Sequence, residues 1–301
     1  MSHLIKHIRP IQFFRYFSIM AVSSDLPSSL TGNPECALVR PGVCQFTPEF
    51  TSVPLLERWQ ISPTSSVLRF GLPDPSHPLN LSTCACILAK ADIPDTDGVL
   101  EPVIRPYTPI STNTQIGSFD LLVKDYGESG RMSNYLCKMK KGQEIAFKHI
   151  DFNVKMQAPF PYKTVSMLVG GTGITPMIQA LHAILGDQSC ETKVIVLYGS
   201  RVSSDILGKE LLDTWCDKSS RLEVVHILSH EPDDSSWTGA RGHISKEMIA
   251  KFFPDPKDND NIIFVCGPPP MYDVFSGPRD QKELSGVLDE MGYKAEQVYK
   301  F

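Results

Sequence analysis

One short segment combines a guanidinium group, an aromatic ring and two hydroxyl groups within seven residues: R-P-Y-T-P-I-S, from Arg105 to Ser111. Arg105 offers a planar cation that suits a pyrophosphate, and Tyr107, which follows Pro106, offers an aromatic face for a flat ring system. The hydroxyls of Thr108 and Ser111 can bond to a ring nitrogen or a ribityl oxygen. The segment therefore predicts a site for a flavin dinucleotide. The alternative is an ordinary strand end followed by a proline turn.

A glycine-rich turn follows about sixty residues later, between an apolar run and an amphipathic stretch. The apolar run 165–169 predicts a buried strand, and apolar residues at helical spacing predict a helix over 176–185, with Pro176 at its first position and Gly186 at its end. The turn is neither a G-x-G-x-x-G fingerprint nor a P-loop. N–H groups at the start of such a helix can nevertheless bind a phosphate. The residues expected at this phosphate site are Gly170, Gly171, Thr172, Gly173, Thr175 and Pro176.

A second glycine-containing segment follows another apolar run, residues 262–266. It begins at Cys266 and continues through Gly267 and Pro268 to Met271. Ligands of open parallel sheets bind outside the carboxyl ends of the strands. Because this segment and the glycine turn both begin at such ends, we expect them to bind the same nucleotide.

The motifs occur in a fixed order: R-P-Y-T-x-x-S, then G-R-M-S at residues 130–133, G-G-T-G-I-T-P, C-G-P-P-P-M, and a terminal aromatic residue, Phe301. This order resembles the NADH–cytochrome b5 reductase family of the ferredoxin–NADP reductase superfamily. The resemblance runs from about Phe46 to Phe301, and the tail looks most like the mitochondrial forms of fungi and plants. It implies an FAD-dependent reductase that passes a hydride from NADH to FAD and then single electrons to cytochrome b5.

The resemblance also implies individual roles in flavin binding. Thr108 would hydrogen-bond to the flavin ring as a catalytic residue, and Thr175 would touch the same ring. Arg131 replaces the family's usual lysine, which keeps the charge and adds a planar fork. The other residues expected along the flavin or its pyrophosphate are Leu122, Lys124, Tyr126, Gly130, Met132 and Ser133. The alternatives are a solvated strand charge for Lys124 and a simple helix start for Thr175.

Two residues are expected beside the nicotinamide. In the family, the sulfur of the residue matching Cys266 lies near that ring, so we expect Cys266 to position the nicotinamide rather than to react covalently. The alternative is a buried strand cysteine. The family's C-terminal aromatic lies near the flavin and the nicotinamide, which implies this place for Phe301, with a disordered tail as the alternative.

The expected adenine-ribose pocket lacks the acidic residue that NADH-preferring family members often carry. Ser200 and Arg201 follow the predicted strand 194–198, and Thr238 follows Trp237 at a position that is often acidic in animal forms. A hydroxyl and a guanidinium can bind a ribose 2′-phosphate. The overall match favours NADH, and these residues leave NADPH use open.

Two other functions fit parts of the pattern. One is an NADPH-dependent reductase of another one-electron carrier, such as a ferredoxin or flavodoxin. The other is a flavin- and nucleotide-binding module without turnover, against which the intact hydroxyls, glycines and Cys266 argue.

Lysines on the predicted flavin domain suggest the electron acceptor. They could steer an acidic cytochrome b5-like haem protein, with a solubilising surface as the alternative. These lysines are Lys138, Lys140, Lys141, Lys148 and Lys155.

Composition narrows the class of protein. The chain has 301 residues, enough for two ordinary domains, and 42% of them are hydrophobic. A formal net charge of −5 argues against general nucleic-acid binding. The eight cysteines lack CxxC or zinc-finger spacing, so we expect reduced, mostly buried thiols and no metal site.

Hydrophobic periodicity predicts two domains of different kinds. Short strands punctuated by Pro, Gly and Asp predict an antiparallel β-barrel flavin domain over residues 44–151, with one helix over 133–139 that Ser133 would cap. Strands that alternate with helices predict an α/β doubly wound parallel-sheet nucleotide domain over residues 163–301. Its helices are expected over 176–185, 205–215, 246–252 and 281–291.

Residues 1–34 are expected to form a targeting leader and linker. Residues 1–24 contain no acidic side chain and combine Lys6, Arg9 and Arg15 with bulky apolar residues. This composition predicts a mitochondrial presequence. The apolar part is too short for a bilayer-spanning helix of about 20 residues, so at most peripheral membrane contact is expected. The alternative locations are cytosolic or membrane-peripheral.

Overall fold

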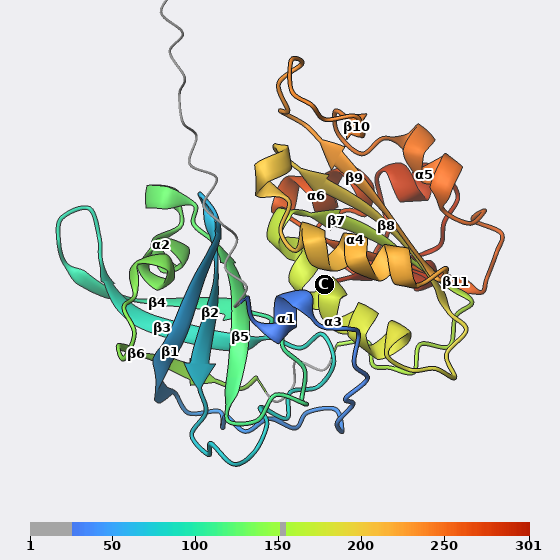
Figure 1. Cartoon of the computed structure of the whole chain (residues 1–301). Coiled ribbons are helices and arrows are strands. Elements are labelled where there is room, and N and C mark those ends of the chain that lie inside the picture. The colour runs from blue at the N-terminus through green and yellow to red at the C-terminus, as the bar shows by residue number, and fades with distance from the viewer. Residues whose placement is uncertain (1–25, 151–154) are drawn as a thin grey trace, which may run out of the picture.

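Two domains lie side by side in the computed structural model, which describes residues 26–150 and 155–301 (Figure 1). Within this described part, each domain is built on one six-stranded sheet. Most of the predicted leader lies outside the described residues. No helix in the described ranges is both long and apolar enough to cross a membrane.

The first sheet is antiparallel and curls around a core of aromatic rings, as the predicted barrel class requires. Its strand order is β4-β3-β6-β1-β2-β5. Phe46, Phe70, Phe119 and Phe147 pack with ring centroids 5.1–5.8 Å apart. The strands are β1 (Thr51–Ser62), β2 (Ser65–Gly71), β3 (Ile87–Pro94), β4 (Leu100–Tyr107), β5 (Ser118–Lys124) and β6 (Glu144–Lys148).

Helix α2 (Arg131–Lys138) buries Met132 and Leu136 against this aromatic core. The prediction that Ser133 caps the helix was wrong, because the helix begins two residues earlier and Gly130 occupies the N-cap position. Ser133 lies inside the first turn, where its hydroxyl donates to the carbonyl of Gly130 at 2.9 Å.

The second sheet is entirely parallel, which confirms the predicted doubly wound class. Its order is β10-β9-β8-β7-β11-β12. Helices α3 and α4 pack on one face, and α5, α6 and α7 pack on the other (Figure 1). The strands are β7 (Thr164–Gly170), β8 (Lys193–Ser200), β9 (Leu222–Leu228), β10 (Ala240–Arg241), β11 (Asn261–Cys266) and β12 (Val298–Lys300). The helices are α3 (Ile174–Leu185), α4 (Lys209–Lys218), α5 (Lys246–Phe252), α6 (Pro269–Phe275) and α7 (Val287–Glu290).

Glycines in the left-handed region explain two errors in the predicted helices. Helix α4 begins at Lys209 rather than Asp205 because Gly208 has a φ of 68°. Gly286, with a φ of 75°, ends the irregular segment before α7, so the helix predicted over 281–291 is reduced to one short turn. Helix α3 begins at Ile174, which makes Pro176 its third residue rather than its first.

The direction in which strands are added to the second sheet reverses between β7 and β11. From β7 the chain builds β8, β9 and β10 outward in one direction, and it then returns to place β11 on the other side of β7. The carboxyl ends of β7 and β11, at Gly170 and Cys266, are therefore neighbours at the switch point. Open α/β sheets bind their ligands at this point.

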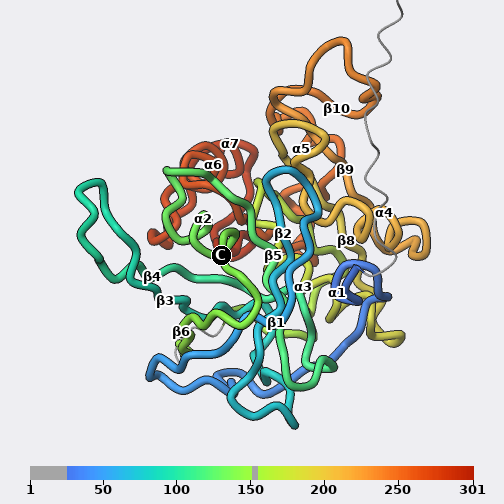
Figure 2. The backbone as a smooth tube through the Cα atoms, turned by 60° about the vertical axis from the view of Figure 1, so that its left-hand side comes forward, coloured from blue at the N-terminus to red at the C-terminus, as the bar shows by residue number. Residues whose placement is uncertain are grey.

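An N-terminal strap, residues 26–37, ties the two domains together. It includes the short helix α1 (Ser28–Thr31), which lies beside α4 (Figures 1 and 2). On the nucleotide domain, Trp215 Nε1 donates to the carbonyl of Gly32 at 2.9 Å. On the barrel, the buried Ser29 hydroxyl donates to Asp120 at 2.6 Å. Most of the strap falls in the segment that we interpreted as linker, yet its hydrogen bonds hold it against both domains.

Replacing Asp120 with alanine is expected to lower the free energy of unfolding by about 3–5 kcal/mol. The fully buried carboxylate accepts two hydrogen bonds from Arg69, at 2.7 and 2.8 Å, and one from Ser29, so its loss leaves buried donors unpaired. Guanidinium denaturation followed by tryptophan fluorescence measures the change. The control is Glu57→Gln, since Glu57 lies 3.9 Å from Arg69 with its side chain 49% exposed; we expect a loss under about 1 kcal/mol. Equal losses of unfolding free energy in the two variants would contradict this structural role of the Asp120 carboxylate.

Candidate functional site

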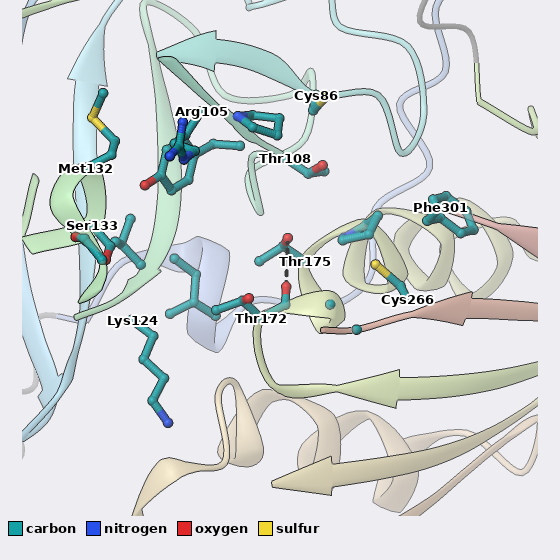
Figure 3. A pocket seen from close by; sticks show the side chains of 18 of the residues that line it. Cys86, Arg105, Thr108, Lys124, Met132, Ser133, Thr172, Thr175, Cys266 and Phe301 are labelled. Atoms are coloured by element: carbon teal, nitrogen blue, oxygen red, sulfur yellow. Dashed lines mark hydrogen bonds between the residues drawn. The ribbon is translucent and has the colours of Figure 1, made fainter. Parts of the chain in front are cut away.

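The first cleft lies between the two domains and has a volume of about 400 Å³. The barrel contributes the end of β4, the end of β5 and the start of α2. The nucleotide domain contributes the glycine turn and the end of β11 (Figure 3). A cleft of this size between domains is a usual place for a cofactor.

The end of β4 brings the predicted flavin motif to this cleft. Arg105, Pro106, Tyr107 and Thr108 all line it. Arg105 is exposed and donates to the carbonyl of Ile104 at 2.7 Å, so most of its guanidinium donors remain available. Burial raises the pKa of the Tyr107 phenol, which therefore stays neutral. This strand end presents a cation, an aromatic ring and a hydroxyl to one cavity.

The start of α2 supplies further donors. A side chain at Gly130 would place its Cβ 2.4 Å from Ser133 Oγ and 2.6 Å from Tyr126 Cβ, so the turn requires glycine. The helix has no side-chain N-cap, which leaves N–H groups of its first turn for another acceptor. Arg131 bonds to Glu101 and to the carbonyl of Ile93, but its buried Nε has no hydrogen-bond partner among the described residues. These donors, together with the aromatic ring and hydroxyl on β4, fit the pyrophosphate and ring system of a flavin dinucleotide.

The glycine turn and the segment after β11 are in backbone contact. A Cβ at Gly173 would lie 2.2 Å from the Cys266 carbonyl oxygen, and one at Gly170 would lie 2.8 Å from Met271 Sδ. At Gly173 the obstacle is backbone, so no side chain can replace its hydrogen, whereas at Gly170 the obstacle is the Met271 side chain. Thr175 closes the turn by donating to the carbonyl of Thr172 at 3.2 Å (Figure 3). The two segments form one continuous floor.

Cys266 and Phe301 meet at the nucleotide-domain end of the first cleft (Figure 3). Burial raises the pKa of the Cys266 thiol to about 11, so the sulfur is protonated at neutral pH, which suits positioning and not nucleophilic attack. Phe301 is buried, its N–H donates to Val265, and its carbonyl accepts from the Tyr272 hydroxyl at 2.7 Å. A disordered tail is therefore excluded.

The second cleft lies outside the carboxyl ends of β7, β8 and β11 and has a volume of about 700 Å³. Ser200 and Arg201 line it where β8 ends. Ser200 Oγ is buried and has no hydrogen-bond partner within residues 26–150 and 155–301, and Arg201 is exposed. Thr238 lines neither cleft as the described residues define them, whereas His243 lines the second.

The structure brings nearly all of the predicted site residues together. The first cleft alone holds Arg105, Pro106, Tyr107, Thr108, Leu122, Gly130, Arg131, Met132, Ser133, Gly173, Thr175, Pro176, Cys266 and Phe301. The second cleft alone holds Gly170, Gly171, Ser200, Arg201, Pro268 and Met271. Both clefts share Lys124, Tyr126, Thr172 and Gly267. Their individual roles remain predictions.

Ser111 is an exception, as Thr238 is, because it lines neither cleft in the described part of the chain. Its hydroxyl accepts the backbone N–H of Asp120 at 2.9 Å, and its carbonyl accepts from Gln179 of α3 at 2.8 Å. The hydroxyl that we expected to bind the cofactor instead fixes the turn after β4.

Several lining residues were missed. In the first cleft they include Cys84, Cys86, Lys155, Tyr272 and Arg279, and in the second Asp205, Ser229, His243 and Ile244. These residues reach the clefts only because segments that are distant in the sequence pack together. No local sequence motif predicts that they line a site. The eight cysteines, which all lie in the described ranges, form no disulfide. No group of three or more His, Cys, Asp or Glu in those ranges could hold a metal ion.

The five predicted docking lysines do not form one surface. Lys138, Lys140 and Lys141 are exposed around the end of α2. Lys148 lies over the ring of Phe50, 4.9 Å from its centroid. Lys155 lines the first cleft, and burial lowers its pKa.

Comparison with known families identifies both halves of the chain. The model of the "Oxidoreductase FAD-binding domain" matches residues 52–151, and that of the "Oxidoreductase NAD-binding domain" matches residues 167–276. NADH-cytochrome b5 reductase 2 of Neosartorya fischeri is 39% identical over 246 residues, which cover 80% of this chain and 74% of the relative. The protein of the same name from Scheffersomyces stipitis is 37% identical over 258 residues, 84% of each chain.

Solved structures share the arrangement of the two domains. The cytochrome b5 reductase domain of Ulva prolifera nitrate reductase has a TM-score of 0.75 and 26% identity, over 86% of this chain and all of that one. A ferredoxin NADP+ reductase from Neisseria gonorrhoeae with bound FAD and NADP has a TM-score of 0.62 over 83% of this chain and 96% of that one. At 17% identity, the second comparison concerns the fold alone.

Replacing Arg105 with alanine is expected to weaken flavin retention by about 1.5–3 kcal/mol, since it removes a charge-assisted contact. This corresponds to a rise of roughly 10- to 150-fold in the flavin dissociation constant. Recovery of flavin fluorescence on dilution measures it. Lys90→Ala is the matched control, because Lys90 pairs with Ile104 on the neighbouring strand but does not line the first cleft. If the Arg105 variant keeps its full flavin content under dilute dialysis, Arg105 does not contribute to flavin retention.

Proposed function

The chain belongs to the NADH–cytochrome b5 reductase family, and from this premise we propose that it is an FAD-dependent reductase that carries electrons from NADH to a cytochrome b5-like haem protein. One observation carries the proposal: a cleft with flavin-binding groups and a dinucleotide cleft share a single floor. In that floor, the turn at Gly173 touches the backbone of Cys266. A nicotinamide and a flavin ring can therefore meet where the two clefts join.

Bound FAD supplies the capacity to accept a hydride and to release electrons one at a time. The chain's own residues bind and orient the reactants. Arg105 and Arg131 would hold the flavin pyrophosphate, and the Thr108 hydroxyl would hydrogen-bond to the ring system. Cys266, protonated at neutral pH because its pKa is raised to about 11, would act as a neutral wall beside the nicotinamide. Phe301 closes the same end and limits access of water.

The purified protein is expected to be yellow, and acid should release FAD rather than FMN. Under anaerobic conditions NADH should bleach the flavin absorbance, and oxidised cytochrome b5 should restore it. Bleaching by NADPH alone, with recovery on adding a ferredoxin or flavodoxin, would select the reductase of another carrier. A flavin that neither nucleotide bleaches would select the binding module without turnover.

We propose that the acidic acceptor docks near Lys138, Lys140 and Lys141, which are exposed around the end of α2, the helix whose start lines the first cleft. Attraction between exposed charges weakens with salt. The rate of cytochrome b5 reduction should fall as ionic strength rises, while flavin reduction by NADH changes little. A rate of cytochrome reduction that does not depend on salt would contradict the proposed docking site.

NADPH use is expected to depend on Arg201, the exposed cation at the end of β8 in the second cleft. Arg201→Ala should raise the NADH-to-NADPH ratio of kcat/KM by roughly 5- to 150-fold, since one charge-assisted contact to a 2′-phosphate is worth about 1–3 kcal/mol. Lys209→Ala, outside both clefts, is the control and should leave the ratio unchanged. If Thr238→Asp raises the ratio and Arg201→Ala does not, the ribose lies at the Trp237–Thr238 loop instead.

We also propose a mitochondrial location, which rests on the acid-free, arginine-containing residues 1–24. The same segment would allow at most peripheral contact with a membrane. Residues 1–24 fused to a fluorescent reporter should carry it to mitochondria, and substitution of Arg9 and Arg15 by glutamate should abolish the transfer. A cytosolic wild-type fusion would refute the location.

A further inference from the structure

Two pairs of side chains separate the first cleft from the second, and each pair joins the barrel to the nucleotide domain. Tyr126 Oη is hydrogen-bonded to Thr172 Oγ1 at 3.3 Å, and Lys124 Nζ forms an ion pair with Asp205 Oδ2 at 2.9 Å. Lys124, Tyr126 and Thr172 line both clefts, and Asp205 lines the second. Any ligand that occupies both clefts must therefore pass these four residues.

The Lys124–Asp205 ion pair is largely enclosed. Its side chains are 13% and 16% exposed, so the two charges attract more strongly than a pair on the surface would. The other carboxylate oxygen of Asp205 accepts the Thr64 hydroxyl at 3.0 Å. Lys124 extends toward the nucleotide domain and away from Arg105 and Thr108 (Figure 3).

A nicotinamide dinucleotide brings a second anion to this place. On the proposed function, its nicotinamide ring must reach Cys266 in the first cleft while its adenosine half occupies the second. The pyrophosphate between these halves then lies near the boundary. Among the described residues, Lys124 is the one cationic side chain that lines both clefts. A pyrophosphate at this boundary would therefore approach an ammonium that Asp205 already pairs with.

We infer that Asp205 is a positioning residue that competes with the dinucleotide pyrophosphate for Lys124. Without nucleotide, the carboxylate holds the ammonium at the boundary. When nucleotide binds, the ammonium changes partner, and Asp205 is left beside an anion. The carboxylate thereby lowers the affinity for the dinucleotide and favours release of the oxidised product. This inference rests on the proposed function, because it requires a dinucleotide across both clefts.

The test is calorimetric titration of NAD+ into the flavin-loaded protein. Asp205→Asn should lower the dissociation constant by roughly 3- to 10-fold, because binding no longer breaks an ion pair. The affinity of this variant should also fall more steeply with salt, since its unpaired ammonium attracts counterions that binding releases. Asp205→Glu restores the charge and should bind as the wild type does.

Glu231→Gln is the matched control. Glu231 accepts the backbone N–H and hydroxyl of Ser203, at 2.6 and 2.9 Å, in the same turn that carries Asp205, but it lines neither cleft in the described ranges. This variant removes a carboxylate that contacts the turn without freeing Lys124, so its NAD+ affinity should match that of the wild type.

Lys124→Gln tests the other partner and does not depend on the folding of the Asp205 variant. In samples matched for flavin content it should weaken NAD+ binding at least fivefold, and adding Asp205→Asn to it should give less tightening than in the wild-type background. An Asp205→Asn variant that binds NAD+ no more tightly than the wild type, or a Lys124→Gln variant with unchanged affinity, overturns the inference. Bleaching of the wild-type flavin by NADH tests the proposed function separately, so the two failures are distinguishable.

Discussion

The functional architecture depends on one close backbone contact at the switch point of the parallel sheet. The turn after β7 and the segment after β11 approach until a side chain on Gly173 would sit 2.2 Å from the carbonyl oxygen of Cys266. That approach is possible because β7 and β11 are hydrogen-bonded neighbours whose chains leave the sheet at the same edge. It joins the two segments into one floor at which the two clefts meet. Any added atom would push the segments apart and separate the clefts.

Hydrogen bonds between the domains hold the barrel next to that floor. Gln179 of α3 donates to the carbonyls of Pro109 and Ser111, at 2.7 and 2.8 Å, and so holds the turn after β4 against the nucleotide domain. The N-terminal strap spans the same interface through Ser29 on one side and Gly32 on the other. Hydride transfer requires reacting groups to be held within a narrow range of distances. These hydrogen bonds restrict how far the domains can move.

The charges of the site oppose those of the protein as a whole. The chain carries a net charge of −5, yet Arg105, Arg131, Lys155 and Arg279 line the first cleft. The cleft walls therefore present cations to anionic cofactors although the chain as a whole carries a negative net charge. The same separation explains why Asp205 matters: it is a carboxylate that lines a cleft built for anions. In the structure its charge is paired with that of Lys124.

The local chemistry of the site was determined by the sequence alone. Arg105, Tyr107 and Thr108 are adjacent, and the glycines of the turn lie between a predicted strand and helix, so covalent connectivity brings their groups together. Alternating and helical periodicity also predicted both sheet types. The longest strand, β1, was missed because Pro54, Glu57 and Arg58 interrupt its alternation.

Only the tertiary structure decided which distant groups meet. Three contacts join residues from separate segments. They are the Lys124–Asp205 ion pair, the contact of Gly173 with Cys266, and the hydrogen bond from the Asp120 N–H to the Ser111 hydroxyl. Such contacts are fixed by the docking of whole elements, whose balance of burial and hydrogen bonding is spread over many residues. A sequence motif specifies which groups a segment carries. The packing of the two domains decides which of those groups face the cleft.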